Sequence, residues 1–299
     1  MRGVPVKLFD FKKKKADRLF KEAQQLDKDG ETEASIAKYL DAIACDPDNS
    51  TSHYNLGLIY KYRGDWQRSF DFNQKANALD PGDEAARWNL AIAATALRNW
   101  PVARSKWKEN GIDLGEGEGP IEMDFGMTPV RLNPDDDAEV VWATRIDPAR
   151  ARLDSVPFPQ SGFYYGDVVL NDGAPVGFRS WNECEYPVFN VLGLFEPSVY
   201  TTCVVTVTVE SDSDLDALTE NFSATRSHFE DWTQNTRVLC KACSEGRPHE
   251  QHDHELETGW SCERRLGIAI YPGDDIRQIL NQWEQSSTGR VVSVESVER

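Results

Sequence analysis

The sequence contains no long apolar run. No stretch approaches the ~20 consecutive apolar residues that a membrane-spanning helix requires, so we expect no membrane partner. The first twenty residues, MRGVPVKLFDFKKKKADRLF, include a run of lysines but lack the apolar segment of ~7–15 residues that a secretory signal needs. We therefore predict a cytoplasmic protein whose six cysteines are reduced, serving as core residues or metal ligands rather than as a disulfide framework.

Signatures of the common enzyme classes are also missing. The chain has no phosphate-binding glycine loop with a lysine, no Gly-x-Ser-x-Gly nucleophile turn and no dinucleotide-binding fingerprint. The stretch GEGEGP at 115–120 follows a helical pattern rather than a strand, and its glutamates would repel phosphate, so we interpret it as a linker. These absences favour a non-enzymatic protein.

Basic residues are scarce in the later part of the chain. Residues 1–114 carry 19 Lys+Arg and 17 Asp+Glu, whereas residues 115–299 carry 14 and 33. A negative surface repels the phosphate backbone of nucleic acids and attracts basic proteins. We therefore expect no nucleic-acid partner and predict a protein or peptide partner of basic character. The alternative interpretation is that the acidity only keeps the chain soluble.

The first third of the chain contains a repeat of 34 residues. The residues that recur at this spacing are Gly30 and Gly64, Ala42 and Ala76, Pro47 and Pro81, Trp66 and Trp100, and the blocks YNLGL (54–58) and WNLAI (88–92). Apolar residues within each unit follow a helical period, so each unit is predicted to form two helices joined by a turn. Glycine permits the turn, and proline ends the second helix.

This pattern resembles the tetratricopeptide repeat family over residues 16–112. The first two units, 16–49 and 50–83, carry the turn glycine and the terminal proline, whereas the third has Arg98 at the turn and no terminal proline. The resemblance implies an all-α array of helical hairpins over 16–114. It also implies a concave face, lined by the first helix of each hairpin, that binds a peptide or protein.

On that face, the resemblance selects four candidate partner-binding residues: Tyr54, Asn55, Trp88 and Asn89. A clamp for a terminal carboxylate is not expected, because Phe20 and Gln24 stand where it would need lysine and asparagine. For the two asparagines the alternative is an ordinary hydrogen bond from one helix to another.

The pattern changes after residue 114. We predict a basic N-terminal segment at 1–15, an acidic, glycine-rich linker at 115–138 and a β-rich module, a small sheet or barrel, at 139–198. Within this module Asn171-Asp172-Gly173 is typical of a hairpin turn. Its aromatic stretches, GFYYGD (162–167) and FRSWNE (178–183), suit either a binding surface or, more commonly, a core.

The last hundred residues, 199–299, have the pattern of an α+β domain. Strands are predicted at 200–210, 236–240, 264–271 and 290–297. Two intervening helices each have one apolar face, formed by Leu215, Leu218, Phe222 and Phe229 in the first and by Ile276, Ile279, Leu280 and Trp283 in the second. The order β-α-β-β-α-β is typical of ferredoxin-like domains, a fold that serves many functions.

A stretch rich in cysteine and histidine, LCKACSEGRPHEQHDHE (239–255), connects the second and third of these predicted strands. The candidate metal ligands are Cys240, Cys243, His249, His252, His254 and Cys262. The Cys-x-x-Cys spacing lets two thiolates face one ion, which predicts a structural zinc site that organises the long connection. The alternatives are a polar loop without metal, a catalytic metal centre and a thioredoxin-type redox pair.

Together these features predict a multidomain, non-enzymatic interaction protein: a tetratricopeptide array, a β-rich module and a ferredoxin-like domain. Its acidic half would sequester a basic partner, as bacterial immunity proteins do with nuclease toxins. The competing hypothesis is a metal-dependent enzyme that uses the cysteine and histidine residues of 240–262.

Overall fold

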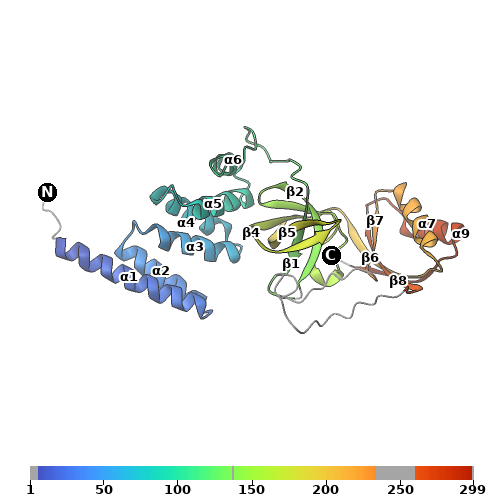
Figure 1. The fold of residues 1–299 in the computed structure, drawn as a ribbon, viewed down its shortest axis with the longest axis horizontal. Helices are drawn as coiled ribbons and strands as arrows, with labels where there is room; N and C mark the ends of the chain where they lie inside the picture. The colour runs from blue at the N-terminus through green and yellow to red at the C-terminus, as the bar shows by residue number, and fades with distance from the viewer. Residues whose placement is uncertain (1–5, 137, 234–259, 298–299) are drawn as a thin grey trace. The chain divides into compact units, whose positions relative to one another are not determined.

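The computed structural model describes residues 6–136, 138–233 and 260–297 and divides the chain into two compact units. Unit 1 comprises Met1–Ile121 and unit 2 comprises Glu122–Arg299 (Figure 1). No helix among the described residues is both long and apolar enough to cross a bilayer. The four cysteines within the described ranges are free thiols.

Unit 1 is built from helical hairpins. Its helices are α1 (Val6–Lys28), α2 (Thr32–Cys45), α3 (Ser50–Tyr62), α4 (Trp66–Leu79), α5 (Glu84–Ala96) and α6 (Trp100–Glu109). The predicted basic segment 1–15 is not separate from the array, because α1 already includes residues 6–15. Lysine is a good helix former, so its four-residue run does not interrupt a helix.

The turns inside the three hairpins share one backbone conformation. Gly30, Gly64 and Arg98, spaced 34 residues apart, all have positive φ angles, of 79°, 69° and 56°. Glycine adopts this left-handed conformation without steric cost, and arginine does so at Arg98 because the third hairpin needs the same turn. The third repeat therefore continues the array although its turn glycine is missing.

Helix caps repeat with the same spacing. Side-chain oxygens of four residues accept hydrogen bonds from backbone N–H groups at helix N-termini: Asn49, Asp65, Asp83 and Asn99. These caps satisfy N–H groups that have no partner inside the helix. The repeat thus specifies where helices begin as well as which residues enter the core, such as the buried Leu56 and Leu90.

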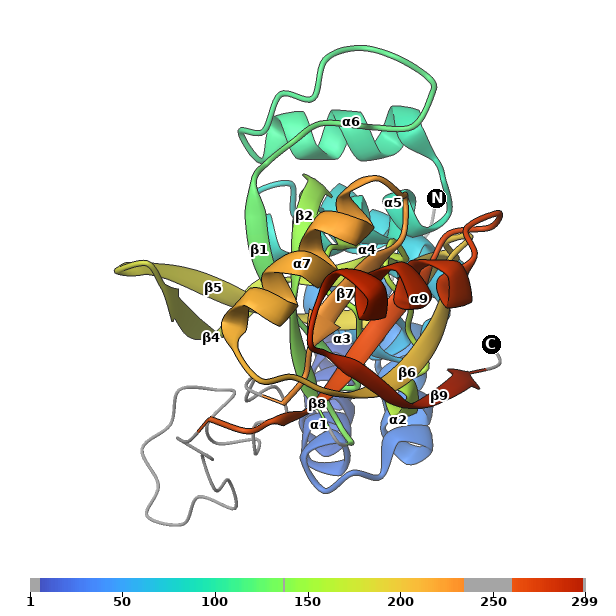
Figure 2. The same ribbon diagram turned by 90° about the vertical axis from the view of Figure 1, so that its right-hand side faces the viewer.

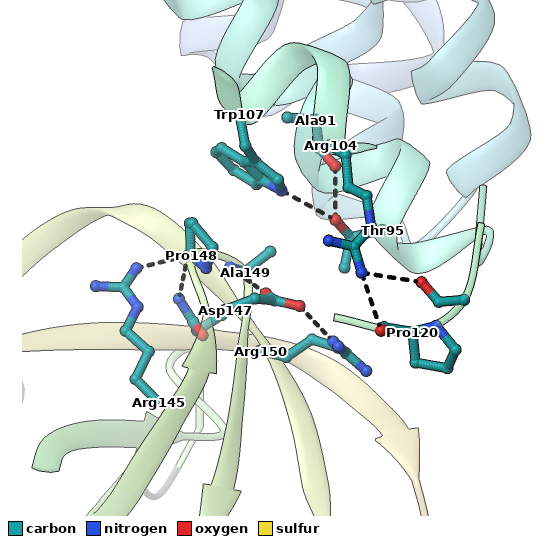
Figure 3. Close-up of polar contacts among 12 residues, drawn as sticks. Ala91, Thr95, Arg104, Trp107, Pro120, Arg145, Asp147, Pro148, Ala149 and Arg150 are labelled. Carbon is teal, nitrogen blue, oxygen red and sulfur yellow. Dashed lines mark hydrogen bonds and ion pairs between the residues drawn. The ribbon is translucent and has the colours of Figure 1, made fainter. Parts of the chain in front are cut away.

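Parts of the predicted linker 115–138 are held by hydrogen bonds or belong to a strand. Arg104 on α6 donates hydrogen bonds to the backbone oxygens of Leu114, Gly115 and Gly119. It also donates to Pro120 at 3.1 Å (Figure 3), and together these bonds fasten the glycine-rich stretch to α6. Residues 127–132 form the first strand of unit 2. That strand is missed from sequence because Pro129 and the acidic surroundings conceal its pattern.

The first part of unit 2 is a closed five-stranded barrel. Its strands are β1 (Met127–Leu132), β2 (Glu139–Asp147), β3 (Arg150–Leu153), β4 (Val168–Trp181) and β5 (Cys184–Glu196). Consecutive strands pair antiparallel, and β1 closes the barrel by pairing parallel to β5, with Val130 opposite Phe189. The interior is apolar and includes Val130, Leu132, Val141 and Val169.

The turn predicted at Asn171-Asp172-Gly173 is wrong. These residues lie within β4, where the register with β5 shifts. The Asn171 side chain donates to the backbone oxygen of Pro148 at 3.3 Å, so it stabilises an irregular strand instead of a turn. The chain reverses at Asn182 and Glu183, both with positive φ, and the β4–β5 hairpin extends away from the barrel (Figure 2).

The second part of unit 2, among the described residues, contains four strands and two helices. Its elements are β6 (Thr201–Thr208), α7 (Asp212–Ser223), β7 (His228–Asp231), β8 (Glu263–Ile270), α9 (Ile276–Ser286) and β9 (Arg290–Val297). The strands form one antiparallel sheet in the order β7-β8-β6-β9. Both helices cover the same face of this sheet, where Val205, Leu218, Ile268 and Trp283 form the core (Figure 2).

One detail of this region differs from the sequence prediction. Phe229, which we expected on the first helix, lies in β7, because α7 ends at Ser223. Phe222 and Phe229 are nonetheless in contact, with ring centroids 5.1 Å apart. The strand predicted at 236–240 lies outside the described residues.

Burial of a histidine gives unit 1 a testable pH dependence. His53 on α3, the only histidine in unit 1, is 7% exposed, and its Nε2 lies 3.0 Å from the backbone oxygen of Pro47. Burial, supported by the nearby charge of Lys75, lowers the pKa of His53, against the smaller opposing effects of Pro47 and Asp48. The unfolded chain, with a histidine pKa near 6.5, therefore binds the proton more readily than the folded one.

We thus expect unit 1 to be fully stable above about pH 6.5 and to lose stability as the pH falls toward the folded pKa, by at most about 1.4 kcal/mol per pH unit. Hydrogen exchange of α3 amides in urea, between about pH 7.5 and 5.5, measures this loss. The control is His53→Gln, which keeps a donor for Pro47 but does not titrate. An identical pH slope in this variant would show that other groups are responsible.

Candidate functional site

The two predicted asparagines of the helical face connect neighbouring helices. Asn55 Nδ2 on α3 donates to the Tyr39 hydroxyl on α2 at 3.1 Å. Asn89 Oδ1 on α5 accepts a hydrogen bond from Lys61 Nζ on α3 at 3.1 Å, and both residues are buried. Both asparagines thus make bonds of the helix-to-helix kind that the sequence analysis gave as the alternative to partner contact. A contact of these amides with a partner stays a prediction.

The two predicted aromatic residues differ in their surroundings. Tyr54 on α3 is partly buried. Trp88 on α5 packs edge-on against Trp107 of α6, with centroids 4.9 Å apart and an interplanar angle of 79°. Trp88 therefore helps to attach the last helix of the array, while Tyr54 and the exposed Tyr62 on the same helix offer aromatic surface.

Trp107 anchors the end of the array. Its side chain is fully buried, and its Nε1 donates to Thr95 Oγ1 at 3.4 Å. Thr95 in turn donates to the backbone oxygen of Ala91 at 2.9 Å (Figure 3). The Trp107 indole thus links α6 to α5 and holds the two helices of the third hairpin together.

Most of the predicted metal ligands lie outside the described residues, namely Cys240, Cys243, His249, His252 and His254. Cys262 is described and exposed, and its backbone oxygen accepts a hydrogen bond from Val209 N at 2.8 Å. Within the described ranges, no three His, Cys, Asp or Glu residues gather closely enough to hold a metal ion. The zinc site stays a prediction.

An ion pair is buried at the β2–β3 turn of the barrel. Arg150 Nε lies 2.6 Å from Asp147 Oδ2, and both side chains are almost inaccessible to water. Asp147 also accepts from Ala149 N at 2.8 Å, and Arg145 donates to the backbone oxygen of Pro148 at 2.5 Å (Figure 3). These contacts keep a tight turn closed, so we interpret the pair as structural.

A cleft of about 350 Å³ lies in unit 2, where the barrel meets β7. Its lining comprises Met127, Trp142, Asp154, Ser155, Val156, Tyr165, Trp181, His228, Phe229 and Glu230. Strand β7 is held there because Trp232 Nε1 donates to the backbone oxygen of Val156 at 3.1 Å, and Val156 N donates to Glu230 Oε2 at 3.0 Å. The cleft is therefore formed by residues far apart in sequence and joined by hydrogen bonds between side chains and the backbone.

The rings in the cleft contact one another. Tyr165 and His228 stack with centroids 4.4 Å apart, and Trp142 and Trp181 approach to 6.0 Å. Burial raises the pKa of Tyr165 to about 12 and lowers the pKa of His228, so both side chains are neutral at pH 7. Among the residues that line the cleft, the acidic ones are Asp154 and Glu230.

Asp154 is one of these carboxylates. Its Oδ2 accepts a hydrogen bond from Thr144 Oγ1 at 2.7 Å. Removal from water raises its pKa and the nearby Asp124 adds to the increase, whereas the Thr144 bond and the charge of Arg152 oppose it. A carboxylate whose charged form is disfavoured by burial gains from a cation placed next to it.

Sequence comparison identifies the helical part. The family described as "TPR repeat" matches residues 24–64. The chain contains tetratricopeptide repeats. It is also similar to the photosystem I assembly protein Ycf3 of Acaryochloris marina (strain MBIC 11017), with 25% identity over 145 residues, covering 47% of this chain and 81% of that protein.

Solved structures with partial similarity include two tetratricopeptide domains. The second such domain of Spaghetti (RPAP3), bound to the HSP90 peptide SRMEEVD, is 20% identical and covers 35% of this chain and 90% of that chain, with a TM-score of 0.33. The Arabidopsis OM64 domain is 15% identical over 32% of this chain and 80% of that chain, with a TM-score of 0.30. A hypothetical protein from Neisseria gonorrhoeae is 13% identical and covers 58% of this chain and 94% of that chain, with a TM-score of 0.26.

Sequence reasoning found the tetratricopeptide repeats but missed the cleft. Its only signal was the pair of aromatic stretches GFYYGD and FRSWNE, which supply Tyr165 and Trp181 to one cleft. Other rings of these stretches are placed differently, since Tyr164 is buried and Phe178 is 62% exposed. Nothing in the local sequence distinguishes these rings from one another, so only the fold shows which of them share a site.

Proposed function

We propose that this protein binds a basic protein or peptide through its tetratricopeptide segment and its acidic unit 2, without catalysis. The observation that carries the proposal is the combination of a helical array of an interaction type with strongly unequal charge. Residues 122–299 hold 14 Lys+Arg and 31 Asp+Glu. Repeats of this kind supply an extended surface for a partner, and the negative unit would accelerate encounter with a positive one.

Sequestration is the specific role that we propose. A binder that covers a basic protein by charge and needs no catalytic group fits an immunity or antitoxin-like protein. The support is the absence of enzyme motifs in the sequence together with its acidity.

Salt dependence tests the electrostatic part of this proposal. Stoichiometric partners would be captured from the native lysate and identified by mass spectrometry, and association rates would then be measured with the purified partner. The rate should fall steeply as salt rises, because the screening length decreases from ~10 Å at 0.1 M to ~3 Å at 1 M. Equal rates at low and high salt would indicate that the partner binds the apolar face of the repeats and not the acidic unit. Recovery of no stoichiometric polypeptide at any salt would reject the proposal.

We also propose that residues 199–299 form a ferredoxin-like domain. The support is the antiparallel sheet order β7-β8-β6-β9 with α7 and α9 on one face, which places β8 between the two strands that α7 connects. This arrangement is a split β-α-β unit. It adds no function by itself.

The sequence further supports a proposal of one structural zinc ion bound within 240–262. Protein purified without chelator and kept reduced should then contain about one equivalent of zinc by elemental analysis. Cys243→Ser should release the ion while the tetratricopeptide repeats stay folded, since they take their stability from neighbouring repeats. The matched control is Cys45→Ser on α2. Metal-free wild-type protein, or equal zinc content in the Cys243→Ser variant, would eliminate the site.

A further inference from the structure

The cleft of unit 2 has the chemical composition of a site for an organic cation. Five of its lining side chains are aromatic: Trp142, Tyr165, Trp181, His228 and Phe229. Two more, Asp154 and Glu230, are carboxylates, and no lysine or arginine is among the lining residues, all of which the structure describes. Aromatic faces and carboxylates both attract positive charge, and they repel anions.

The size and openness of the cleft suit a single side chain. Its volume of about 350 Å³ lies at the lower end of the range for small-molecule sites. Trp181, at the end of β4, is 49% exposed, so part of its ring is available to a ligand. The Asp154 residue is exposed overall, while its carboxylate is partly withdrawn from water and its Oδ2 already accepts the Thr144 hydroxyl. A ligand that enters from solvent therefore meets an indole ring and a carboxylate.

The chain already uses guanidinium and indole groups together beside this cleft. The Arg179 guanidinium carbon lies 5.1 Å from the centre of the Trp142 ring, and its Nη1 donates to the backbone oxygen of Val140 at 3.0 Å. A guanidinium is planar, stacks on aromatic rings and is less strongly hydrated than an ammonium group. Moving a guanidinium from water into a ring-lined cleft therefore costs less hydration free energy than moving an ammonium group.

We propose that this cleft binds the side chain of an arginine presented by the protein partner. The guanidinium would pair with the Asp154 carboxylate and lie against Trp181, while Tyr165 and His228 form the neutral wall. This inference rests on the basic partner proposed above, and it names the contact that would select such a partner. A planar cation with directed N–H groups uses both the ring and the carboxylate, which a purely apolar side chain does not.

A blocked amino acid tests the cleft without the partner. N-acetyl-L-arginine N-methylamide would be titrated into the full-length protein while the indole N–H signals of the nine tryptophans are followed by ¹H–¹⁵N NMR. Signals of Trp142 and Trp181, assigned from their phenylalanine variants, should shift and saturate. The citrulline analogue has the same shape without charge and should bind roughly tenfold more weakly or worse. The blocked lysine should also bind more weakly.

Two variants with matched controls locate the binding. Asp154→Asn removes the charge and should weaken arginine binding roughly tenfold, whereas Glu185→Gln on β5, outside the cleft, should not. Trp181→Ala should also weaken it, whereas Phe178→Ala, which removes an exposed ring of β4 outside the cleft, should not. All four positions are exposed, so circular dichroism should report an unchanged fold.

Three results would overturn this inference: no saturable shift with the blocked arginine, equal affinity for arginine and citrulline or lysine, or equal affinity in wild type and Asp154→Asn. The proposed function is tested separately by partner capture. If a partner binds in a salt-dependent manner with equal affinity for wild type and Asp154→Asn, the cleft is not part of the interface, and the proposed function still stands. Arginine binding without any captured partner would reject the proposed function instead.

Discussion

Replacement of Trp107 by alanine is expected to destabilise the end of the tetratricopeptide array by about 3–5 kcal/mol, the usual cost of deleting a buried tryptophan. The Trp107 indole is fully buried on α6, packs edge-on against Trp88 and donates to Thr95. The variant would lose the apolar contacts, leave a cavity and remove the donor to Thr95. Because repeats interact mainly with their neighbours, the loss should concentrate in α5 and α6.

Hydrogen exchange followed by mass spectrometry measures this effect by segment. Amides of α5 and α6 should exchange much faster in Trp107→Ala, together with residues 114–120, which Arg104 of α6 holds. Amides of α1 and α2 should keep their protection. Trp107→Phe is the matched control, because it retains a ring against Trp88 and should lose less stability. Uniform loss of protection across all six helices would show that the array unfolds as one unit.

Gly267→Ala is expected to destabilise unit 2 by about 3 kcal/mol, at the upper end of the cost of overpacking a core. A Cβ atom at Gly267 in β8 would collide with the indole of Trp232. Trp232 has little room to move, since it is 5% exposed, bonds the backbone of Val156 and packs against Phe158 with centroids 4.8 Å apart. The barrel and the sheet of unit 2 would therefore both be disturbed.

The cleft provides a second readout of the same variant. Displacement of Trp232 should move Val156, which lines the cleft, so Gly267→Ala should lower both the exchange protection of β8 and the affinity for blocked arginine. Gly119→Ala is the control, because a Cβ there meets no atom within 4 Å and its φ is not positive. Its stability should change by less than about 0.5 kcal/mol. Wild-type protection of β8 in Gly267→Ala would mean that Trp232 relocates without cost.

Much of unit 1 could be predicted because its determinants are local. The 34-residue spacing marks the turn residues, the helix caps and the buried positions of each hairpin, and even Arg98 takes the turn conformation of the glycines at equivalent positions. Helix starts and ends depend on contacts within one turn of the chain, so a sequence pattern contains them. The pattern does not distinguish between two roles for Asn55 and Asn89, because a polar residue on a helix face can bond to another helix as well as to a partner.

The sequence by itself determined the helical repeats, the elements β6, α7, β8, α9 and β9 after residue 199, and the acidity of unit 2, since these follow from periodicity, capping and composition. Only the tertiary structure decided that β1 pairs with β5 to close a barrel, that the Asn171 segment is an irregular strand, and that Asp154, Tyr165, Trp181 and His228 share one cleft. Such pairings join segments tens of residues apart. They depend on how burial across the whole unit compensates the entropy of closing each loop, a balance that no local pattern records.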